Sequence, residues 1–171
     1  RVLSLGVGST IRGASSGTDP YTTIATNAFH DASAWKYIHS DFASSYEQYN
    51  GTHVFNYAAS GSAAGTVSFS EAMRIDSSGN VGIGIAAPTT HYEKVLHIHE
   101  ASGSSAVHLT NNTTGSAQGD GTDLIAYSSD FYIWNRETNG SFIFGTSTAS
   151  EGTVERMRIN GSGKVGIGTS A

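Results

Sequence analysis

Apolar and polar positions alternate in short runs along this chain, and turn-forming residues separate the runs. Val, Ile, Tyr, Phe, Trp and Thr recur in bursts bounded by Gly, Asn, Asp and Ser, which is typical of β-strands joined by turns. In the segment 155–159, Glu155, Met157 and Ile159 alternate with two arginines, as in a strand with two different faces. No window has the Leu, Glu, Lys, Arg and Gln content of a long helix. The pattern predicts an all-β protein with very little helix.

A block of this pattern occurs twice without a gap. Residues 71–84 read Glu-Ala-Met-Arg-Ile-Asp-Ser-Ser-Gly-Asn-Val-Gly-Ile-Gly, and residues 155–168 read Glu-Arg-Met-Arg-Ile-Asn-Gly-Ser-Gly-Lys-Val-Gly-Ile-Gly. Internal repeats of this kind indicate one structural unit that is used more than once. We therefore expect two tandem, hairpin-rich β modules, 1–88 and 93–171, of which the second breaks off at its C-terminal end.

Two turn sequences predict hairpins within the modules. Asn-Gly at 50–51 and again at 139–140 favours a type I′ turn, because both residues tolerate positive φ. In each case Ser-Asp-Phe lies upstream, and aromatic and β-branched residues follow. The Gly-Ser-Gly run at 161–163 predicts another hairpin, which turns the Met-Arg-Ile strand into the Val-Gly-Ile-Gly strand at 165–168.

The Val-Gly-Ile-Gly strands have side chains on one face and only hydrogen on the other. A glycine inside a strand costs about 0.5–1 kcal/mol relative to alanine, so we expect something to approach the glycine face closely. Two explanations stay open: the backbone of a neighbouring chain packed near a three-fold axis, or a tight bend of the same chain. In the first case the trimer interface contains Val81, Gly82, Ile83, Gly84, Val165, Gly166, Ile167 and Gly168.

The composition limits the classes of partner that we expect for this chain. Only 13% of the residues are charged, the net charge is -5, and the nine basic residues form no cluster, so we expect neither a nucleic acid nor a membrane as a partner. There is no run of 18 apolar residues and no signal-peptide pattern. The chain has no cysteine, so stability cannot come from disulfides, and an oligomeric interface is one alternative source.

The repeated block resembles a sequence found in many bacteriophage tail fibre and tailspike proteins. That pattern is Glu-Arg-Met-Arg-Ile, a Gly-containing turn, Val-Gly-Ile-Gly-Thr, a Pro a few residues later and a Val-Leu-x-Ile strand. It stands here at 73–88 with 95–98, and again at 155–169, with Ile85 where the pattern and the second copy have Thr. The resemblance implies modules stacked along a homotrimeric fibre axis in the virion, outside the cell.

What the resemblance implies for function is structural or adhesive, not enzymatic. The segment would be trimeric shaft or a receptor-binding region that contacts a host cell-surface glycan. Two alternatives stay open. One is a tailspike polysaccharide depolymerase, which needs two carboxylates about 5 to 10 Å apart. The other is a bacterial surface adhesin or filament subunit built from the same repeat.

One metal site is conceivable. His97 and His99 are two positions apart on an expected strand and would face the same way, so three chains around an axis could bring six imidazoles together as metal ligands. His-x-His pairs bind iron in this way along some tail-fibre tips. The interpretation that we favour is that Leu96 and Ile98 face the core while both histidines face solvent. No other cofactor is expected.

Aromatic side chains are the candidates for glycan contact. Most of them should form the core and the trimer interface. Trp35, Tyr46 and Tyr49 fall in more polar surroundings, so we predict that these three could stack on sugar rings. Residues 6–34 have no counterpart in the second module, and a contact surface particular to this protein could lie there.

Two other motifs have simpler explanations. Residues 13–17 match Gly-x-Ser-x-Gly, but the strand and helix that a nucleophile elbow requires are not predicted around them. The run Asp120-Gly121-Thr122-Asp123 could offer oxygens to a calcium ion, but such a run is usually a turn. We name no catalytic residue.

Overall fold

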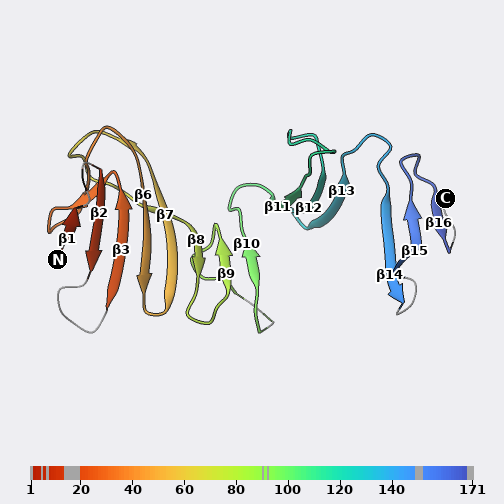
Figure 1. Cartoon of the computed structure of the whole chain (residues 1–171), viewed down its shortest axis with the longest axis horizontal. Coiled ribbons are helices and arrows are strands. Elements are labelled where there is room, and N and C mark those ends of the chain that lie inside the picture. The colour runs from red at the N-terminus through yellow and green to blue at the C-terminus, as the bar shows by residue number, and fades with distance from the viewer. Residues whose placement is uncertain are drawn as a thin grey trace. The chain divides into compact units, whose positions relative to one another are not determined.

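The computed structural model describes residues 2–4, 6, 8–13, 20–89, 91, 93–148 and 152–168. Over these ranges every regular element is a β-strand (Figure 1), so the predicted all-β class is confirmed there. None of the described residues forms a helix that could cross a membrane. The chain divides into two compact units, residues 1–100 and 101–171.

Unit 1 is built on an eight-stranded sheet in the order β1-β2-β3-β6-β7-β8-β9-β10. Neighbouring strands are antiparallel except for β9 and β10, which are parallel. The strands are β1 (Val2–Ser4), β2 (Ser9–Gly13), β3 (Tyr21–Thr26), β6 (Asp41–Tyr49), β7 (Thr52–Gly61), β8 (Ser70–Ile75), β9 (Val81–Ile83) and β10 (Leu96–Ile98).

The hairpin predicted at 50–51 is confirmed. Tyr49 pairs with Thr52 across the turn, and Asn50 and Gly51 have φ angles of 48° and 75°. Positive φ at both central residues is the mark of a type I′ turn, whose twist matches that of the flanking strands.

One face of this sheet is covered by the chain itself. The short strands β4 (Ala28–His30) and β5 (Trp35–Tyr37) form a second sheet, and the backbone of 64–67 bonds to β5. The large sheet contributes alanines at the contact, and the Tyr37 hydroxyl donates a 2.5 Å hydrogen bond to the Ala59 carbonyl. The buried cluster consists of Ala25, Ala28, Tyr37, Ala43, Ala58 and Val67, with Trp35 and Phe69 packed against it.

Asn27 closes the loop that leads into and out of this covering layer. It is buried and has a φ of 53°, a left-handed conformation that Asn tolerates better than most residues. Its side chain donates to the carbonyls of His39 and Phe42 at 3.1 and 2.9 Å and accepts from the His39 N–H at 2.7 Å. The chain segments before β4 and after β5 are thereby held together.

The sequence repeat is also a structural repeat, because β7-β8-β9 of unit 1 has the same register as β14 (Phe142–Thr148), β15 (Gly152–Ile159) and β16 (Val165–Ile167) of unit 2. A β-bulge interrupts the first strand pair at the same place in both copies. Next to the bulge a glutamate pairs with an arginine three residues later, at 2.6 Å in both Glu71–Arg74 and Glu155–Arg158.

The turns that follow the repeated ion pairs are equivalent as well. Asp76 and Asn160 each accept hydrogen bonds on Oδ1 from the backbone N–H groups two and four residues later. The hairpin predicted at 161–163 is therefore confirmed, and Ile159 pairs with Val165 across it.

Unit 2 also contains a sheet of β11 (Ser105–Leu109), β12 (Thr122–Tyr127) and β13 (Asp130–Asn135), separate from β14-β15-β16. The hairpin predicted at 139–140 is wrong, because β13 and β14 belong to different sheets. The reason lies in the Asn135 side chain, which accepts from the Glu137 N–H at 3.0 Å and donates to the Ser141 carbonyl at 3.1 Å. These bonds hold 137–141 in a local turn that leads from one sheet to the next.

In the first copy of the repeat, the chain's own backbone fills the glycine face. A Cβ added to Gly82 would lie 2.5 Å from the Ile85 carbonyl oxygen, and one added to Gly84 would meet the His99 carbonyl. Of the two explanations for these glycines, the tight bend of the same chain therefore accounts for Gly82 and Gly84. Gly166 is buried too, and Gly168 has a φ of 70°.

The opposite face of the same strands is open instead. Ile83 and Val165 are exposed, Ile167 is 76% exposed, and Val81 is half-buried. If these strands contribute to an interface, as the sequence predicts, the contact therefore falls on their Val and Ile side.

We expect Gly82→Ala to lower the free energy of unfolding by about 1–3 kcal/mol, because the new methyl group collides with a backbone oxygen that cannot move freely. Gly119→Ala is the matched control, since a Cβ there has no neighbour within 4 Å, and its effect should stay within about 0.5 kcal/mol. Urea denaturation of both variants measures the difference. Equal stability of the two would contradict the bend described here.

Candidate functional site

The face of the unit 1 sheet that β4 and β5 leave open carries a continuous row of apolar side chains. Residues paired across neighbouring strands point to the same face, and one register line crosses the sheet from β2 to β10 through such residues. We call it the apolar row, and it consists of Ile11, Ile24, Tyr46, Phe55, Met73, Ile83 and Ile98. Ile24, Phe55 and Ile83 are exposed and the other four side chains are half-buried, so none of the row is enclosed by a covering layer within unit 1.

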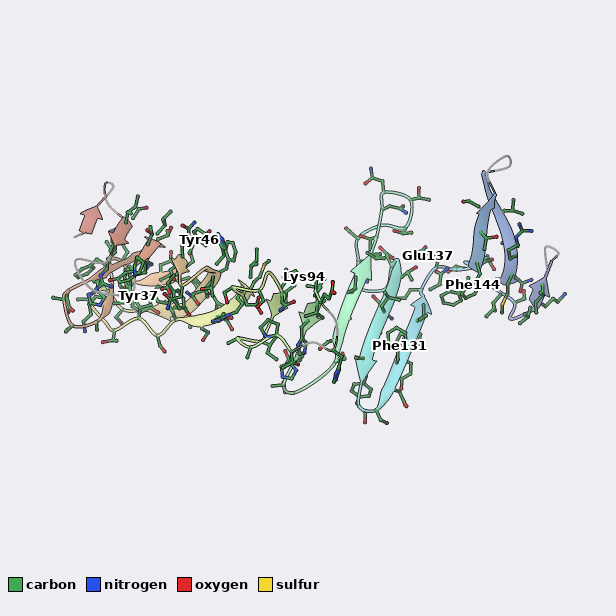
Figure 2. The ribbon with its side chains drawn as sticks, turned by 90° about the horizontal axis from the view of Figure 1, so that it is seen from below. Tyr37, Tyr46, Lys94, Phe131, Glu137 and Phe144 are labelled. Atoms are coloured by element: carbon green, nitrogen blue, oxygen red, sulfur yellow. The ribbon has the colours of Figure 1, made fainter. Side chains whose placement is uncertain are left out.

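Unit 2 has an open apolar face of its own. Val107, Leu124 and Ile133 pair in one register line across β11, β12 and β13. The face, which we call the second apolar face, consists of Val107, Leu109, Leu124, Phe131 and Ile133. All five are exposed, and Phe131 reaches 67%. Figure 2 labels Phe131 on this sheet and Phe144 on β14.

The second apolar face continues into an apolar hollow. The hollow has a volume of about 290 Å³ and is lined by Ile133, Phe142, Ile143, Phe144 and Ile159. Soluble monomers rarely expose contiguous apolar patches of more than a few hundred Å². Faces of this kind are therefore candidates for contact with another protein surface.

The other face of β11-β13 carries a paired charged residue, Asp123, together with the apolar Ile125. Asp123 is only 4% exposed, its Oδ2 accepts a hydrogen bond from Arg136 Nε, and its Oδ1 accepts one from His108 Nδ1 at 2.5 Å. These bonds, first that of Arg136, lower the pKa of the Asp123 carboxyl below its ordinary value. The Arg136 guanidinium also lies 5.0 Å from the centre of the Trp134 ring.

His97 and His99 have no third metal-ligating side chain beside them among the residues that the structure describes. Their rings are 6.2 Å apart and nearly perpendicular, and the described residues contain no group of three or more His, Cys, Asp or Glu side chains placed to hold a metal. His97 pairs in register with Gly82, so it lies on the face opposite the apolar row. An axis along that row would not gather these imidazoles.

The expectation that Leu96 and Ile98 face a core needs correction. Leu96 is 58% exposed, whereas Ile98 and His97 are half-buried, and His97 Nδ1 accepts a hydrogen bond from the Thr89 N–H at 3.3 Å. The reason is that β10 adds to the edge of β9 in parallel and so extends the open face. A metal at His97 and His99 stays a prediction that depends on further copies.

The three aromatic candidates for glycan contact lie on different faces. Tyr46 belongs to the apolar row, where its ring lies 4.9 Å from that of Phe55 and its hydroxyl bonds to His53 Nδ1 at 2.5 Å. Tyr49 is three positions further along β6 and therefore faces the other way. Trp35 projects from β5, with its ring edge-on to Phe69 at 5.9 Å.

Trp35 and Tyr49 line a hollow on the covered side of the sheet. We call it the aromatic hollow. It has a volume of about 280 Å³, and its walls are Arg12, Tyr21, Thr23, Trp35, Glu47 and Tyr49. Arg12, Thr23 and Glu47 share one register line across β2, β3 and β6. Sequence reasoning missed these three, because no local signal indicates which strands pair.

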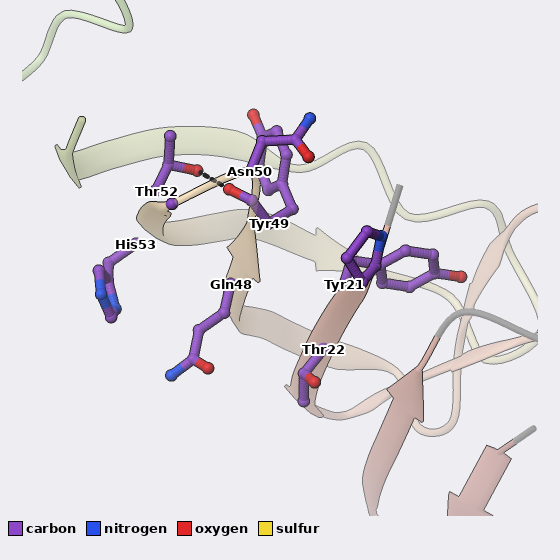
Figure 3. Close-up of a pocket in the computed structure, with 9 residues that line it drawn as sticks. Tyr21, Thr22, Gln48, Tyr49, Asn50, Thr52 and His53 are labelled. Atoms are coloured by element: carbon purple, nitrogen blue, oxygen red, sulfur yellow. Dashed lines mark hydrogen bonds between the residues drawn. The ribbon is translucent and has the colours of Figure 1, made fainter. Parts of the chain in front are cut away.

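A second hollow lies at the Asn50-Gly51 turn (Figure 3). It measures about 430 Å³ and shares Tyr21 and Tyr49 with the aromatic hollow, so the two are neighbours. The Thr52 hydroxyl donates a 2.7 Å hydrogen bond to the Tyr49 carbonyl and braces the turn. The remaining lining residues are Pro20, Thr22, Gln48, Asn50, Gly51, Thr52 and His53.

The other two motifs supply no assembled site. Residues 14–17 of the Gly-x-Ser-x-Gly match lie outside the described residues. Asp120 accepts a 2.8 Å hydrogen bond from the Ala117 N–H, while Asp123 is bound by Arg136 and His108. The two carboxylates thus make separate contacts.

No protein family, curated protein or solved structure matches the chain. Its function is therefore inferred from its own residues and geometry.

We expect Asp123→Asn to lower the midpoint temperature of unit 2 at neutral pH, because Arg136 and His108 lose their charged acceptor. Because the pKa of Asp123 is lowered in the folded state, its ionised carboxyl stabilises the folded state at pH values above the ordinary pKa of 3.8. This contribution disappears as the pH falls through the folded-state pKa. The midpoint temperatures of the variant and of the natural protein should therefore become equal at acidic pH. Thermal denaturation at a series of pH values measures this, with the exposed Asp130→Asn as control. A constant difference across the series would contradict the assignment.

Proposed function

We propose that this chain is a structural and adhesive segment of a bacteriophage tail fibre that works as a homotrimer on the virion, outside the cell. Its two β modules would follow one another along the fibre axis. The observation that carries the proposal is the open apolar face in each unit. The repeated Met-Arg-Ile to Val-Gly-Ile-Gly block adds the resemblance to tail fibre repeats.

Identical copies are the partners that these faces fit best. The apolar row and the second apolar face contain no charged side chain, and burying apolar surface contributes about 25 cal/mol per Å². The charged strand residues Arg12, Glu47 and Arg74 lie on the opposite face, because their register partners on that face include the buried Thr23 and Val54. In each copy, the apolar side chains thus lie on one face of the sheet and the charged side chains on the other. Three copies can enclose their apolar faces and leave the polar faces in water.

An adhesive role agrees with the placement of the aromatic side chains. Trp35 and Tyr49 line a hollow on the side of the sheet that self-association through the apolar row leaves accessible. A host cell-surface glycan would meet the fibre there. Tyr46, in contrast, belongs to the proposed contact between copies.

A depolymerase activity is not favoured. Glu47 is the carboxylate of the aromatic hollow, and its electrostatic neighbour is Glu71. Glu71 binds Arg74 through both carboxylate oxygens, at 2.8 and 2.6 Å. The same ion pair recurs as Glu155–Arg158 in the second copy, so a structural role in the repeat accounts for Glu71.

We expect Ile24→Asp and Leu124→Asp, one change on each apolar face, to shift the midpoint concentration for trimer formation of the full-length protein at least about 100-fold. The physical reason is that each copy would bury an unpaired carboxylate in an apolar contact. Native mass spectrometry and light scattering measure the assembly.

Ser129→Asp, at the exposed tip of the β12-β13 hairpin, is the control and should leave the trimer intact. Circular dichroism checks that each variant remains folded. A natural full-length protein that stays monomeric at high concentration, or variants that assemble as well as the control, would refute the proposal.

A further inference from the structure

We propose that the aromatic hollow binds a single neutral pyranose unit of a polysaccharide. The walls of this hollow combine three aromatic rings with one guanidinium and one carboxylate, namely Tyr21, Trp35, Tyr49, Arg12 and Glu47. They come from β2, β3, β5 and β6, so the packing of β5 on the large sheet holds the hollow in shape. The proposal deepens the adhesive role and rests on it only for the source of the polysaccharide.

The aromatic walls suit the C–H faces of a sugar ring. An aromatic ring offers a flat apolar surface at a small cost in side-chain entropy, and Tyr and Trp add a polar edge. Trp35 is half-buried and fixed by its edge-on contacts with Phe69 and His30, at 5.9 and 5.4 Å. The Arg12 guanidinium lies 5.0 Å from the centre of the Tyr21 ring, which holds its donors beside the hollow.

Glu47 supplies an acceptor that the protein leaves unused. Its carboxylate is half-buried, and none of the residues that the structure describes donates a hydrogen bond to it. Burial raises the pKa of Glu47, Arg12 opposes this, and Glu71 adds to it. A carboxylate in such a place costs stability, and two neighbouring sugar hydroxyls would provide the missing donors.

The charges of the hollow select a neutral sugar. Arg12 and Glu47 carry opposite charges, so their fields largely cancel for a ligand between them. A charged sugar would therefore gain little net attraction from this pair, and its charged group would still lose its hydration on entering the hollow. A neutral ring can instead accept hydrogen bonds from the guanidinium and donate to the carboxylate.

The size and position of the hollow agree with one ring of a longer polymer. A volume of about 280 Å³ is just below the usual range for small-molecule pockets, which begins at about 300 Å³. The neighbouring hollow at the Asn50-Gly51 turn, of about 430 Å³, offers room for the next unit. Arg12, Thr23 and Glu47 face away from the apolar row, so contact between copies through that row leaves the hollow open to solvent.

The test is a titration of the full chain with D-galactose, D-glucose and L-rhamnose, and with D-glucuronate and D-glucosamine as charged counterparts. Saturation-transfer NMR and tryptophan fluorescence report binding. We expect at least one neutral sugar to bind with a Kd of about 1–10 mM, and its charged counterparts to bind at least about tenfold more weakly. Glu47→Gln and Tyr49→Ala should each raise the Kd about tenfold, and Tyr127→Ala in unit 2 should leave it unchanged.

Stability separates a lost site from a damaged fold. Because the folded-state pKa of Glu47 is raised, its carboxyl lowers stability progressively as the pH rises above the ordinary value of 4.5, and the loss is complete above the folded-state pKa. Glu47→Gln should therefore melt at a higher temperature than the natural protein at neutral pH while it binds sugar more weakly.

Binding of no neutral sugar, equal binding of the charged sugars, or full binding by Glu47→Gln would overturn the inference. A trimer that binds none of these sugars would refute sugar binding in the aromatic hollow and leave the proposed assembly standing. A monomer that binds them would refute the proposed assembly and leave the hollow standing.

Discussion

Successive side chains of a β-strand point to opposite faces of its sheet, and in unit 1 the chain supplies a covering layer for one face only. β4, β5 and 64–67 lie over the alanines of β3, β6 and β7. The other face keeps its apolar row in contact with solvent. The buried core, the proposed contact between copies and the proposed sugar site all follow from this division, because each takes its sheet residues from one face.

The local features of the fold could be predicted from the sequence, since they depend on residues close together in the chain. The Asn-Gly turn at 50–51 and the Gly-Ser-Gly turn at 161–163 are examples. The same Asn-Gly signal failed at 139–140, because the Asn135 side chain binds the intervening backbone and directs the chain into another sheet. The glycine pattern at 82 indicated a close approach correctly, but it could not tell that the approaching group is the Ile85 carbonyl.

The candidate site could be predicted only in part. Trp35 and Tyr49 stood out as aromatic residues in polar surroundings, whereas Arg12, Thr23 and Glu47 carried no signal of their own. These three meet because β2, β3 and β6 pair in a particular register, and β4 and β5 intervene between β3 and β6 in the sequence. Register between strands that are distant in the sequence is set by the packing of the whole unit, which a local pattern does not contain.

If the proposed function holds, the alternation along β6 has a consequence for the evolution of host range. Glu47 and Tyr49 lie on one face of this strand and Tyr46 on the other, so mutations at the first two positions would alter the proposed sugar site while the proposed contacts between copies persist. A virus with such a strand would change its preferred host through substitutions that selection for particle integrity does not remove.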